Sequence, residues 1–198
     1  MADHRIDKGR RRFLTQVTTG VGLVGGVVAA TPFVLSMTPS ERARAAGAPV
    51  EIDISKLEPG QMITEEWRGK PVWIVSRTPE MLEGLQSVEP KLADPGSEQS
   101  DQPEYAQNMH RSVKPEILVL VGICTHLGCA PVEKFAVGPK SELGADWTGG
   151  FFCPCHGSKF DLAGRVYANV PAPTNLVVPP YKFLSDTLIL VGEDGGTA

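Results

Sequence analysis

All four cysteines of this chain lie in two short segments, CTHLGC at 124–129 and CPCHGS at 153–158. Two of its four histidines, His126 and His156, lie in the same segments. Thiols and imidazoles gathered in this way are typical of a metal site or a disulfide framework. The two segments must then lie close together in the folded chain. This requirement limits the folds open to the chain more than any other feature.

Four interpretations compete for these segments. Zinc accepts two thiolates and two imidazoles, although zinc motifs usually pair Cys with Cys and His with His, whereas each segment here supplies one of each. Two disulfides suit the even cysteine count but leave both histidines without a role. A nucleophilic Cys–His pair does not account for two similar segments. An iron–sulfur cluster held by two Cys and two His uses both histidines and leaves one thiol per segment free for a disulfide, so we favour it.

The N-terminal part carries a second constraint, because residues 13–37 contain no charged side chain. Such a run is long enough for a helix to cross a hydrocarbon core of roughly 30 Å. Five Lys/Arg precede it within residues 4–12, which places the N-terminus in the cytoplasm and the body across the membrane. The run is too long for the apolar core of a cleaved signal peptide, so we interpret residues 13–37 as an uncleaved transmembrane anchor.

The residues around the anchor suggest how it is used. Arg10 and Arg11 are followed, after one residue, by the pair Phe-Leu, a pattern that resembles the twin-arginine export signal. We therefore interpret residues 1–12 as a cytoplasmic N-terminus with an export signal. Residues 38–49 are polar and Ala-rich with no hydrophobic period, and we expect them to form a flexible tether.

The body, residues 50–198, is predicted to be a mostly β domain, because its apolar residues alternate or run in short blocks between turn residues. Residues 78–115 interrupt this pattern, with a helix that Thr78 caps and Pro79 begins, followed by polar loops. We expect a small antiparallel β-sandwich that carries a helix-and-loop insertion. Strands and hairpins are predicted at 50–57, 62–77, 116–124, 158–168 and 181–192.

The charge of the body excludes one class of partner. Residues 1–50 carry a net charge of +4 and residues 51–198 a net charge of −8. Nucleic-acid binding needs a basic face for the phosphate groups, so we expect no nucleic-acid partner for this domain.

The two hexapeptides together closely resemble the metal-binding segments of the Rieske protein family. The anchor, the tether, the insertion and the segment VPAPTNLVVPP at 170–180 are similar to the bacterial Rieske iron–sulfur subunits of ubiquinol–cytochrome c reductase, the cytochrome bc complex or respiratory complex III. This resemblance covers most of the chain. It implies one 2Fe–2S cluster as cofactor and a Rieske-type β-sandwich whose cluster-binding part spans about 120–175.

The resemblance assigns a role to each Cys and His of the two segments. The implied cluster ligands are Cys124, His126, Cys153 and His156. The implied disulfide joins Cys129 to Cys155, and the outer nitrogen of His156 is expected to hydrogen-bond the quinol. Neutral imidazoles in place of two thiolates raise the reduction potential. An imidazole nitrogen that is free of iron can also exchange a proton, so one site can take up an electron and a proton together.

Residues beside the ligands are expected to tune and shield the cluster. Gly128 and Gly157 allow tight turns in the two loops. By resemblance, Leu127 covers the cluster and touches the partner cytochrome, and the Ser158 hydroxyl donates to a cluster sulfur.

Two further positions follow from the same resemblance. Pro171 to Pro173 resemble a loop that shields the cluster from water. Phe160 departs from the pattern, because high-potential members commonly carry a tyrosine there whose hydroxyl can donate to a ligand sulfur. We therefore expect a potential below that of the tyrosine-bearing relatives.

By resemblance, the chain is a redox subunit of a quinol–cytochrome c oxidoreductase and contributes to the proton-motive force. It is expected to take one electron and a proton from ubiquinol and to deliver the electron to a c-type cytochrome by domain movement. Cytochrome b and c-type cytochrome subunits of a dimeric complex are the expected partners. The expected location is the bacterial inner membrane, with one membrane pass and a periplasmic Rieske domain.

Three other functions stay open on the sequence alone. The chain could serve a different exported enzyme, such as an arsenite oxidase. It could be a soluble Rieske ferredoxin or oxygenase domain, although these usually lack the anchor and the extra cysteine pair. The third alternative is a zinc-stabilised interaction module.

Overall fold

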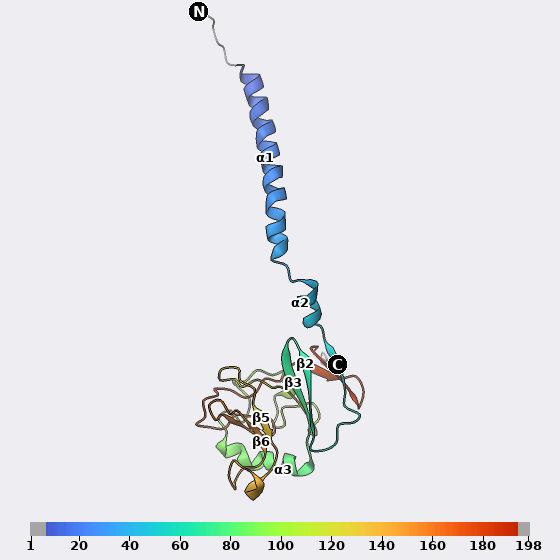
Figure 1. The fold of residues 1–198 in the computed structure, drawn as a ribbon, viewed down its shortest axis with the longest axis vertical. Coiled ribbons are helices and arrows are strands. Elements are labelled where there is room, and N and C mark those ends of the chain that lie inside the picture. The colour runs from blue at the N-terminus through green and yellow to red at the C-terminus, as the bar shows by residue number, and fades with distance from the viewer. Residues whose placement is uncertain (1–6, 194–198) are drawn as a thin grey trace, which may run out of the picture. The chain divides into compact units, whose positions relative to one another are not determined.

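The computed structural model describes residues 7–193, without the side chains of Arg42, Arg44 and Ala46. Its contacts divide the chain into two compact units, Met1–Ala45 and Ala46–Ala198. Figure 1 labels several elements of both units along the chain.

The N-terminal part contains helix α1 (Lys8–Ser36) and the short helix α2 (Glu41–Ala46). Asp7 caps α1, because its carboxylate accepts hydrogen bonds from the amides of Gly9 at 2.9 Å and Arg10 at 3.1 Å. No side chain of α1 is buried by other described residues. At 29 residues the helix is long and apolar enough to cross a membrane.

This part of the chain differs from the prediction in two ways. Helix α1 begins at Lys8 and not at Phe13, because Asp7 provides a cap and the basic run that follows favours helix. Helix α2 occupies part of the predicted flexible tether, where Ala and Arg are good helix formers. Residues 1–6 of the predicted N-terminal segment, and residues 194–198 of the predicted domain, lie outside the described residues.

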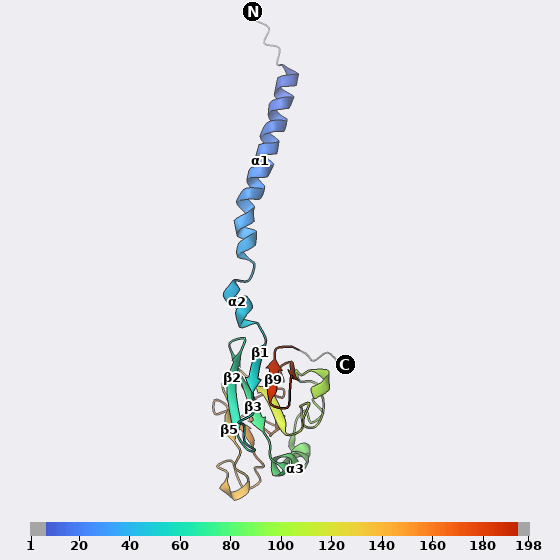
Figure 2. The same cartoon turned by 90° about the vertical axis from the view of Figure 1, so that its right-hand side faces the viewer.

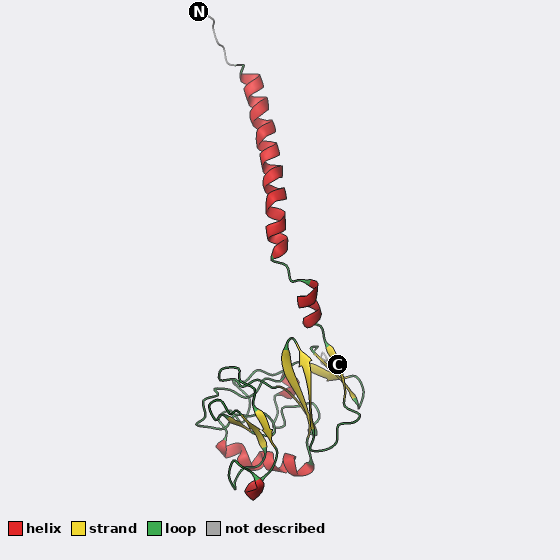
Figure 3. Cartoon of the chain, viewed as in Figure 1, coloured by secondary structure: helices red, strands yellow, loops and turns green. Residues whose placement is uncertain are grey.

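Within the described residues, the second unit contains three antiparallel sheets of three strands each. Their strand orders are β1-β9-β8, β2-β3-β4 and β5-β6-β7. Figure 2 shows β1 beside β9, and Figure 3 shows that loops connect most of these short strands. The prediction of a mostly β domain is confirmed. The strands are β1 (Val50–Asp53), β2 (Met62–Trp67), β3 (Lys70–Ser76), β4 (Ile117–Val121), β5 (Val132–Lys134), β6 (Gly150–Phe152), β7 (Lys159–Phe160), β8 (Tyr181–Phe183) and β9 (Leu188–Val191).

Local sequence explains several of these elements. Arg68 and Gly69 form the turn between β2 and β3, with φ of 54° and 69°, as expected for a two-residue hairpin. Thr78 caps helix α3 (Pro79–Val88), accepting a hydrogen bond from the Met81 amide at 3.3 Å. Short 3₁₀ turns complete the list of helices at Glu89–Lys91, Glu104–Ala106 and Gly138–Lys140.

The predicted insertion is anchored to the C-terminal part of the domain by buried polar groups. The Asn175 side chain donates to the Asp94 carbonyl and to the Ser97 hydroxyl, both at 3.0 Å, and accepts from the Val166 amide at 2.8 Å. Asn175 is fully buried. Buried amides of this kind are stabilising only when their partners are present, so this side chain fixes the insertion against the later hairpin.

Two buried arginines also donate hydrogen bonds to the hairpin at 158–168. Arg77 donates to the Leu162 carbonyl at 3.0 Å, and Arg111 donates to the Ala163 carbonyl at 3.2 Å. Burial lowers the pKa of Arg77 and of Arg111 to about 10, against the attraction of Asp161, so both remain charged at neutral pH. The hairpin that follows the second cysteine segment is therefore held by long-range hydrogen bonds.

The carboxylate of Asp94 provides a pH-dependent test of this anchoring. Burial raises the pKa of Asp94, but hydrogen bonds from the Ser100 hydroxyl and the amides of Glu98 and Gln99, together with the charge of Arg111, bring it below the ordinary 3.8. A carboxyl whose folded-state pKa is lowered adds stability that is complete above its unfolded pKa and is lost as the pH falls through the folded value.

We therefore expect Asp94→Asn to lower the free energy of unfolding by about 1–3 kcal/mol at pH 7, because an amide cannot accept at both atoms. The difference from the parent should shrink below about pH 3.8 as the parent carboxyl itself becomes protonated. Denaturant unfolding of the full chain in detergent at several pH values measures this, with the exposed Glu104→Gln as control. An equal difference at pH 7 and pH 3 would contradict it.

Candidate metal centre

The two cysteine segments, loop 1 (124–129) and loop 2 (153–158), come from strands of different sheets and meet. Loop 1 follows β4, and loop 2 follows β6 directly. A disulfide between Cys129 and Cys155 joins the loops, with their Cα atoms 6.7 Å apart and a sequence separation of 26. This is the pairing that the resemblance implies.

Both loops fold into the same turn. The Cys124 carbonyl accepts from the amide four residues later at 3.0 Å, and its own amide donates to the carbonyl five residues later at 2.8 Å. Cys153 makes the two equivalent hydrogen bonds at 2.9 and 2.8 Å. The fifth residues of the loops, Gly128 and Gly157, have φ of 81° and 78°, which glycine adopts at no steric cost. Cys124 and Cys153 therefore occupy equivalent positions in two loops with the same turn.

The thiols of Cys124 and Cys153 are free and buried, so the interpretation as two disulfides is wrong. Burial raises the pKa of Cys124 and the nearby Cys153 raises it further, while the His126 amide and the Ser158 hydroxyl lower it. The Cys153 sulfur also lies within 4.8 Å of both disulfide sulfurs. Those two sulfurs are bonded to each other, so Cys124 and Cys153 are the cysteines that can bind metal as thiolates.

The two histidine rings of the loops lie next to each other, edge to face. The ring centroids of His126 and His156 lie 4.7 Å apart, with an angle of 89° between the rings. The His126 Nδ1 atom is buried and has no hydrogen-bond partner among the described residues. His156 is exposed. Two buried thiols, two adjacent imidazoles and an unpartnered ring nitrogen make a donor set that fits a cluster held by two Cys and two His.

A third segment, the proline loop (170–174), is fastened to both cysteine loops. The Ala172 amide donates to the Ser158 hydroxyl of loop 2 at 3.0 Å. The Thr125 hydroxyl of loop 1 donates to the Thr174 carbonyl at 2.7 Å. Pro171 and Pro173, predicted to shield the site, are exposed residues of this loop, on either side of the buried Ala172.

The other predicted tuning residues occupy distinct environments. Leu127 at the tip of loop 1 is 73% exposed, which leaves its side chain free to meet a partner. Ser158 is fully buried beside Cys124. Phe160 is fully buried in β7, where it pairs with Phe151 of β6.

Sequence reasoning missed Thr125 and an aromatic contact behind the loops. Thr125 stands between two predicted ligand residues, and a hydroxyl so placed is a signal that the sequence did contain. The aromatic contact joins Trp73 to Phe151, with ring centroids 5.0 Å apart, and no local pattern indicates a pairing across 78 positions.

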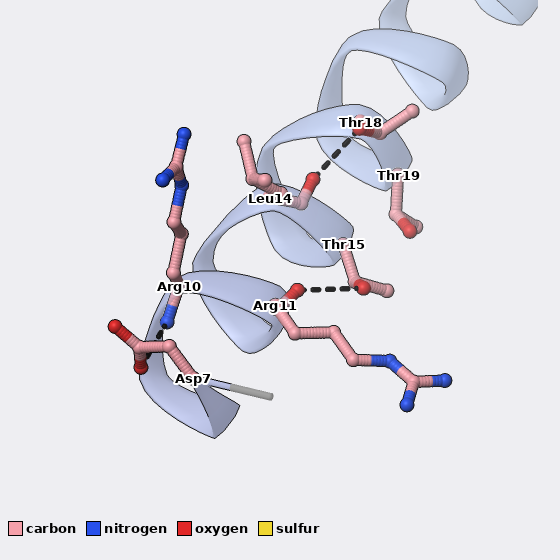
Figure 4. A pocket seen from close by; sticks show the side chains of 7 residues that line it. All are labelled: Asp7, Arg10, Arg11, Leu14, Thr15, Thr18 and Thr19. Atoms are coloured by element: carbon pink, nitrogen blue, oxygen red, sulfur yellow. Dashed lines mark hydrogen bonds between the residues drawn. The ribbon is translucent and has the colours of Figure 1, made fainter. Parts of the chain in front are cut away.

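The twin arginines lie on the first turns of α1. Figure 4 shows that the Arg10 and Arg11 side chains extend to different sides of this helix. They help to line a hollow on the helix surface that contains no thiol or imidazole, so it has no bearing on the metal centre. Asp7 also lines this hollow, and its carboxylate holds the Arg10 amide.

Two protein-family models match parts of this chain. Residues 98–182 match the family described as "Rieske [2Fe-2S] domain". Residues 1–40 match the family described as "Ubiquitinol-cytochrome C reductase Fe-S subunit TAT signal". Among solved structures, one chain titled "Hyperthermophilic respiratory Complex III" is 28% identical with a TM-score of 0.47, covering 88% of this chain and 98% of that one.

Two curated relatives match nearly the whole chain. The ubiquinol–cytochrome c reductase iron–sulfur subunit of Allochromatium vinosum is 61% identical over 198 residues, which is 100% of this chain and 95% of that protein. The subunit of the same name from Bradyrhizobium diazoefficiens is 43% identical, over 96% of this chain and 97% of that protein. The chain therefore belongs to the Rieske iron–sulfur subunits of ubiquinol–cytochrome c reductase.

Proposed function

We propose that this chain carries electrons within ubiquinol–cytochrome c reductase, taking one electron and one proton from ubiquinol and passing the electron to a c-type cytochrome. The observation that carries the proposal is the pair of buried free thiols and the pair of adjacent imidazoles, on loops joined by a disulfide. Full-length similarity to subunits of this enzyme supports the same conclusion.

The proposed ligands form two chemically different pairs, one for each iron of the cluster. Cys124 and Cys153 would bind one iron as thiolates, and His126 and His156 the other through ring nitrogens. When bound, the 2Fe–2S cluster supplies one-electron redox chemistry, and Rieske centres as a class span roughly −150 to +300 mV. Burial of both cysteines excludes water from the thiolate side.

The exposed His156 is proposed to meet the substrate. A ring nitrogen that does not bind iron can accept a hydrogen bond from the quinol hydroxyl and then hold its proton. The exposed Leu127 of loop 1 is proposed to offer an apolar contact for the quinol site and for the partner cytochrome. The proline loop, fastened through Ser158 and Thr125, would limit water access from its own side.

We further propose where the subunit works. The basic residues before the apolar run of α1 favour a cytoplasmic N-terminus, with the Rieske domain in the periplasm of a bacterial inner membrane. Arg10 and Arg11 would direct export of the folded domain. The partners would be cytochrome b and a c-type cytochrome in a dimeric complex, and the segment containing α2 would let the domain move between them.

Electron paramagnetic resonance of the chemically reduced full chain tests the proposal. We expect the signal of a 2Fe–2S centre with mixed Cys and His ligands, and b- and c-type haem in the assembly extracted with mild detergent. A protein that holds zinc and no acid-labile sulfide would contradict the proposal. A Rieske signal without either haem would favour a subunit of a different exported enzyme, such as an arsenite oxidase.

Phe160 provides a prediction about the reduction potential. Phe160→Tyr is expected to raise the midpoint potential, because a buried hydroxyl that donates to a ligand sulfur stabilises the more negative reduced state. Redox titration followed by circular dichroism measures the shift. Phe183→Tyr, in a different sheet, is the matched control and should leave the potential unchanged. An unchanged potential in Phe160→Tyr would show that position 160 does not tune the cluster.

A further inference from the structure

An aromatic pair lies behind the two cysteine loops and joins two of the sheets. Trp73 of β3 stacks on Phe151 of β6, with ring centroids 5.0 Å apart and an angle of 16° between the rings. Trp73 is 5% exposed and Phe151 is fully buried. Phe151 stands two residues before Cys153, so the stack contacts the strand that leads directly into loop 2.

Trp73 also contacts the backbone that leads into loop 1. Gly122 stands two residues before Cys124, and a Cβ placed on it would lie 2.6 Å from both Cζ2 and Nε1 of Trp73. Real side chains do not approach so closely, so only glycine leaves room for the indole. The φ of Gly122 lies outside the left-handed region, so the close approach and not the backbone conformation requires glycine here.

The backbone on this side has little freedom to move away from the indole. The Gly122 amide donates to the Pro71 carbonyl of β3 at 2.8 Å, which holds it to the strand that carries Trp73. Residues Val72–Ser76 of β3 also pair with Ile117–Val121 of β4 in antiparallel register. Trp73 is therefore a fixed support on one side of its contact with Gly122.

We propose that Trp73 is a positioning residue that sets the spacing between the two cysteine loops. Its indole fills the space between the backbone two residues before Cys124 and the ring two residues before Cys153. Both cysteines belong to the same apolar core as this ring pair. Close-packed aromatic rings resist compression, so the thickness of the Trp73–Phe151 stack sets how far apart the two loops lie.

The disulfide cannot replace this support, because it acts at the other end of loop 1. It joins the last residue of loop 1 to the third residue of loop 2, whereas the aromatic pair acts where both loops leave their strands. A ligand set needs its side chains held within a narrow range of positions, and supporting residues that lock them are part of the site. The inference rests on the proposed ligands Cys124 and Cys153.

The test compares variants of the full chain, loaded with cluster and extracted in detergent. Trp73→Leu is expected to lose cluster on the order of tenfold faster than the parent and to show altered resonance g-values and midpoint potential. Trp73→Phe, which keeps an aromatic ring, should restore most of the cluster retention and most of the parental g-values and midpoint potential. Ile74→Ala alters the next residue of β3, also fully buried. It should lower the unfolding temperature without changing the g-values or the potential.

A second pair of variants tests the contact itself and does not depend on removing the indole. Gly122→Ala alone should lose the cluster, because its methyl group overlaps Trp73. Adding Trp73→Leu to Gly122→Ala should recover cluster loading, since the smaller side chain leaves room for the methyl group. Parental g-values and potential in Trp73→Leu, or equal loss in Gly122→Ala with and without Trp73→Leu, would overturn the inference. A parent without a 2Fe–2S signal would instead overturn the proposed function, and this inference with it.

Discussion

Replacing His156 by alanine is expected to abolish quinol oxidation and to remove the 2Fe–2S cluster. His156 is the exposed member of the adjacent imidazole pair, and it is proposed both to bind iron and to meet the quinol. Alanine has no atom that binds iron, and the loss of one of four ligands leaves the cluster open to water. The iron and acid-labile sulfide content measures the first effect, and the rate of quinol-dependent cytochrome c reduction in membranes measures the second.

The control for this experiment is another histidine of the same domain. His110 is partly buried in the insertion, where its carbonyl accepts from Arg77 at 2.9 Å. His110→Ala removes an imidazole but no proposed ligand, so we expect parental iron content and turnover. The Cys129–Cys155 disulfide should still form in His156→Ala, which would show that the loops remain together. Normal quinol oxidation in His156→Ala would refute the assignment of this residue.

The elements that the sequence predicted well are those set by neighbours along the chain. The β2–β3 turn follows from Arg68 and Gly69, and the start of α3 follows from the Thr78 cap and Pro79. Strand β4 follows from a continuous apolar run. The extent of the N-terminal helices was less accessible, because the Asp7 cap lies before the apolar run and Glu41–Ala46 is too short to show a hydrophobic period.

The residues of the candidate site also separate into those that local sequence indicates and those that it does not. The ligands could be proposed from sequence because each loop carries its Cys and His within six residues, and the spacing itself is the signal. The supports of the site come from distant positions. Asn175 reaches Asp94 across 81 residues, and Trp73 meets both strands that lead into the loops. Such contacts depend on how sheets pack, which no local period reports.

The sequence motif of the proline loop does not identify the residues that hold this loop in place. Its prolines were predicted to shield the cluster, yet the residues of this loop that hydrogen-bond the cysteine loops are Ala172 and Thr174. The Ser158 hydroxyl accepts one of these bonds while it lies beside the Cys124 thiol. A serine that was predicted to tune the potential thus also fixes a neighbouring loop.

Removing the disulfide through Cys129→Ala and Cys155→Ala together is expected to lower the free energy of unfolding by about 3–4 kcal/mol. The bond closes a span of 26 residues, and a cross-link of that length restricts the unfolded chain by roughly this amount. The effect should be larger than that of an ordinary surface substitution, which usually changes the free energy of unfolding by less than about 0.5 kcal/mol. Denaturant unfolding in detergent, followed by circular dichroism, measures the difference from the parent.

The same double variant should lose its cluster faster, because the covalent link between the two loops is then missing, and only the metal ligands and the hydrogen bonds to the proline loop join them near the cluster. Parent protein treated with a thiol reductant is the matched control, since it lacks the bond but keeps both side chains. If reduction reproduces the faster loss, the covalent link is what retains the cluster. If the double variant matches the untreated parent in both unfolding and retention, then packing behind the loops suffices, and the disulfide adds nothing to the site.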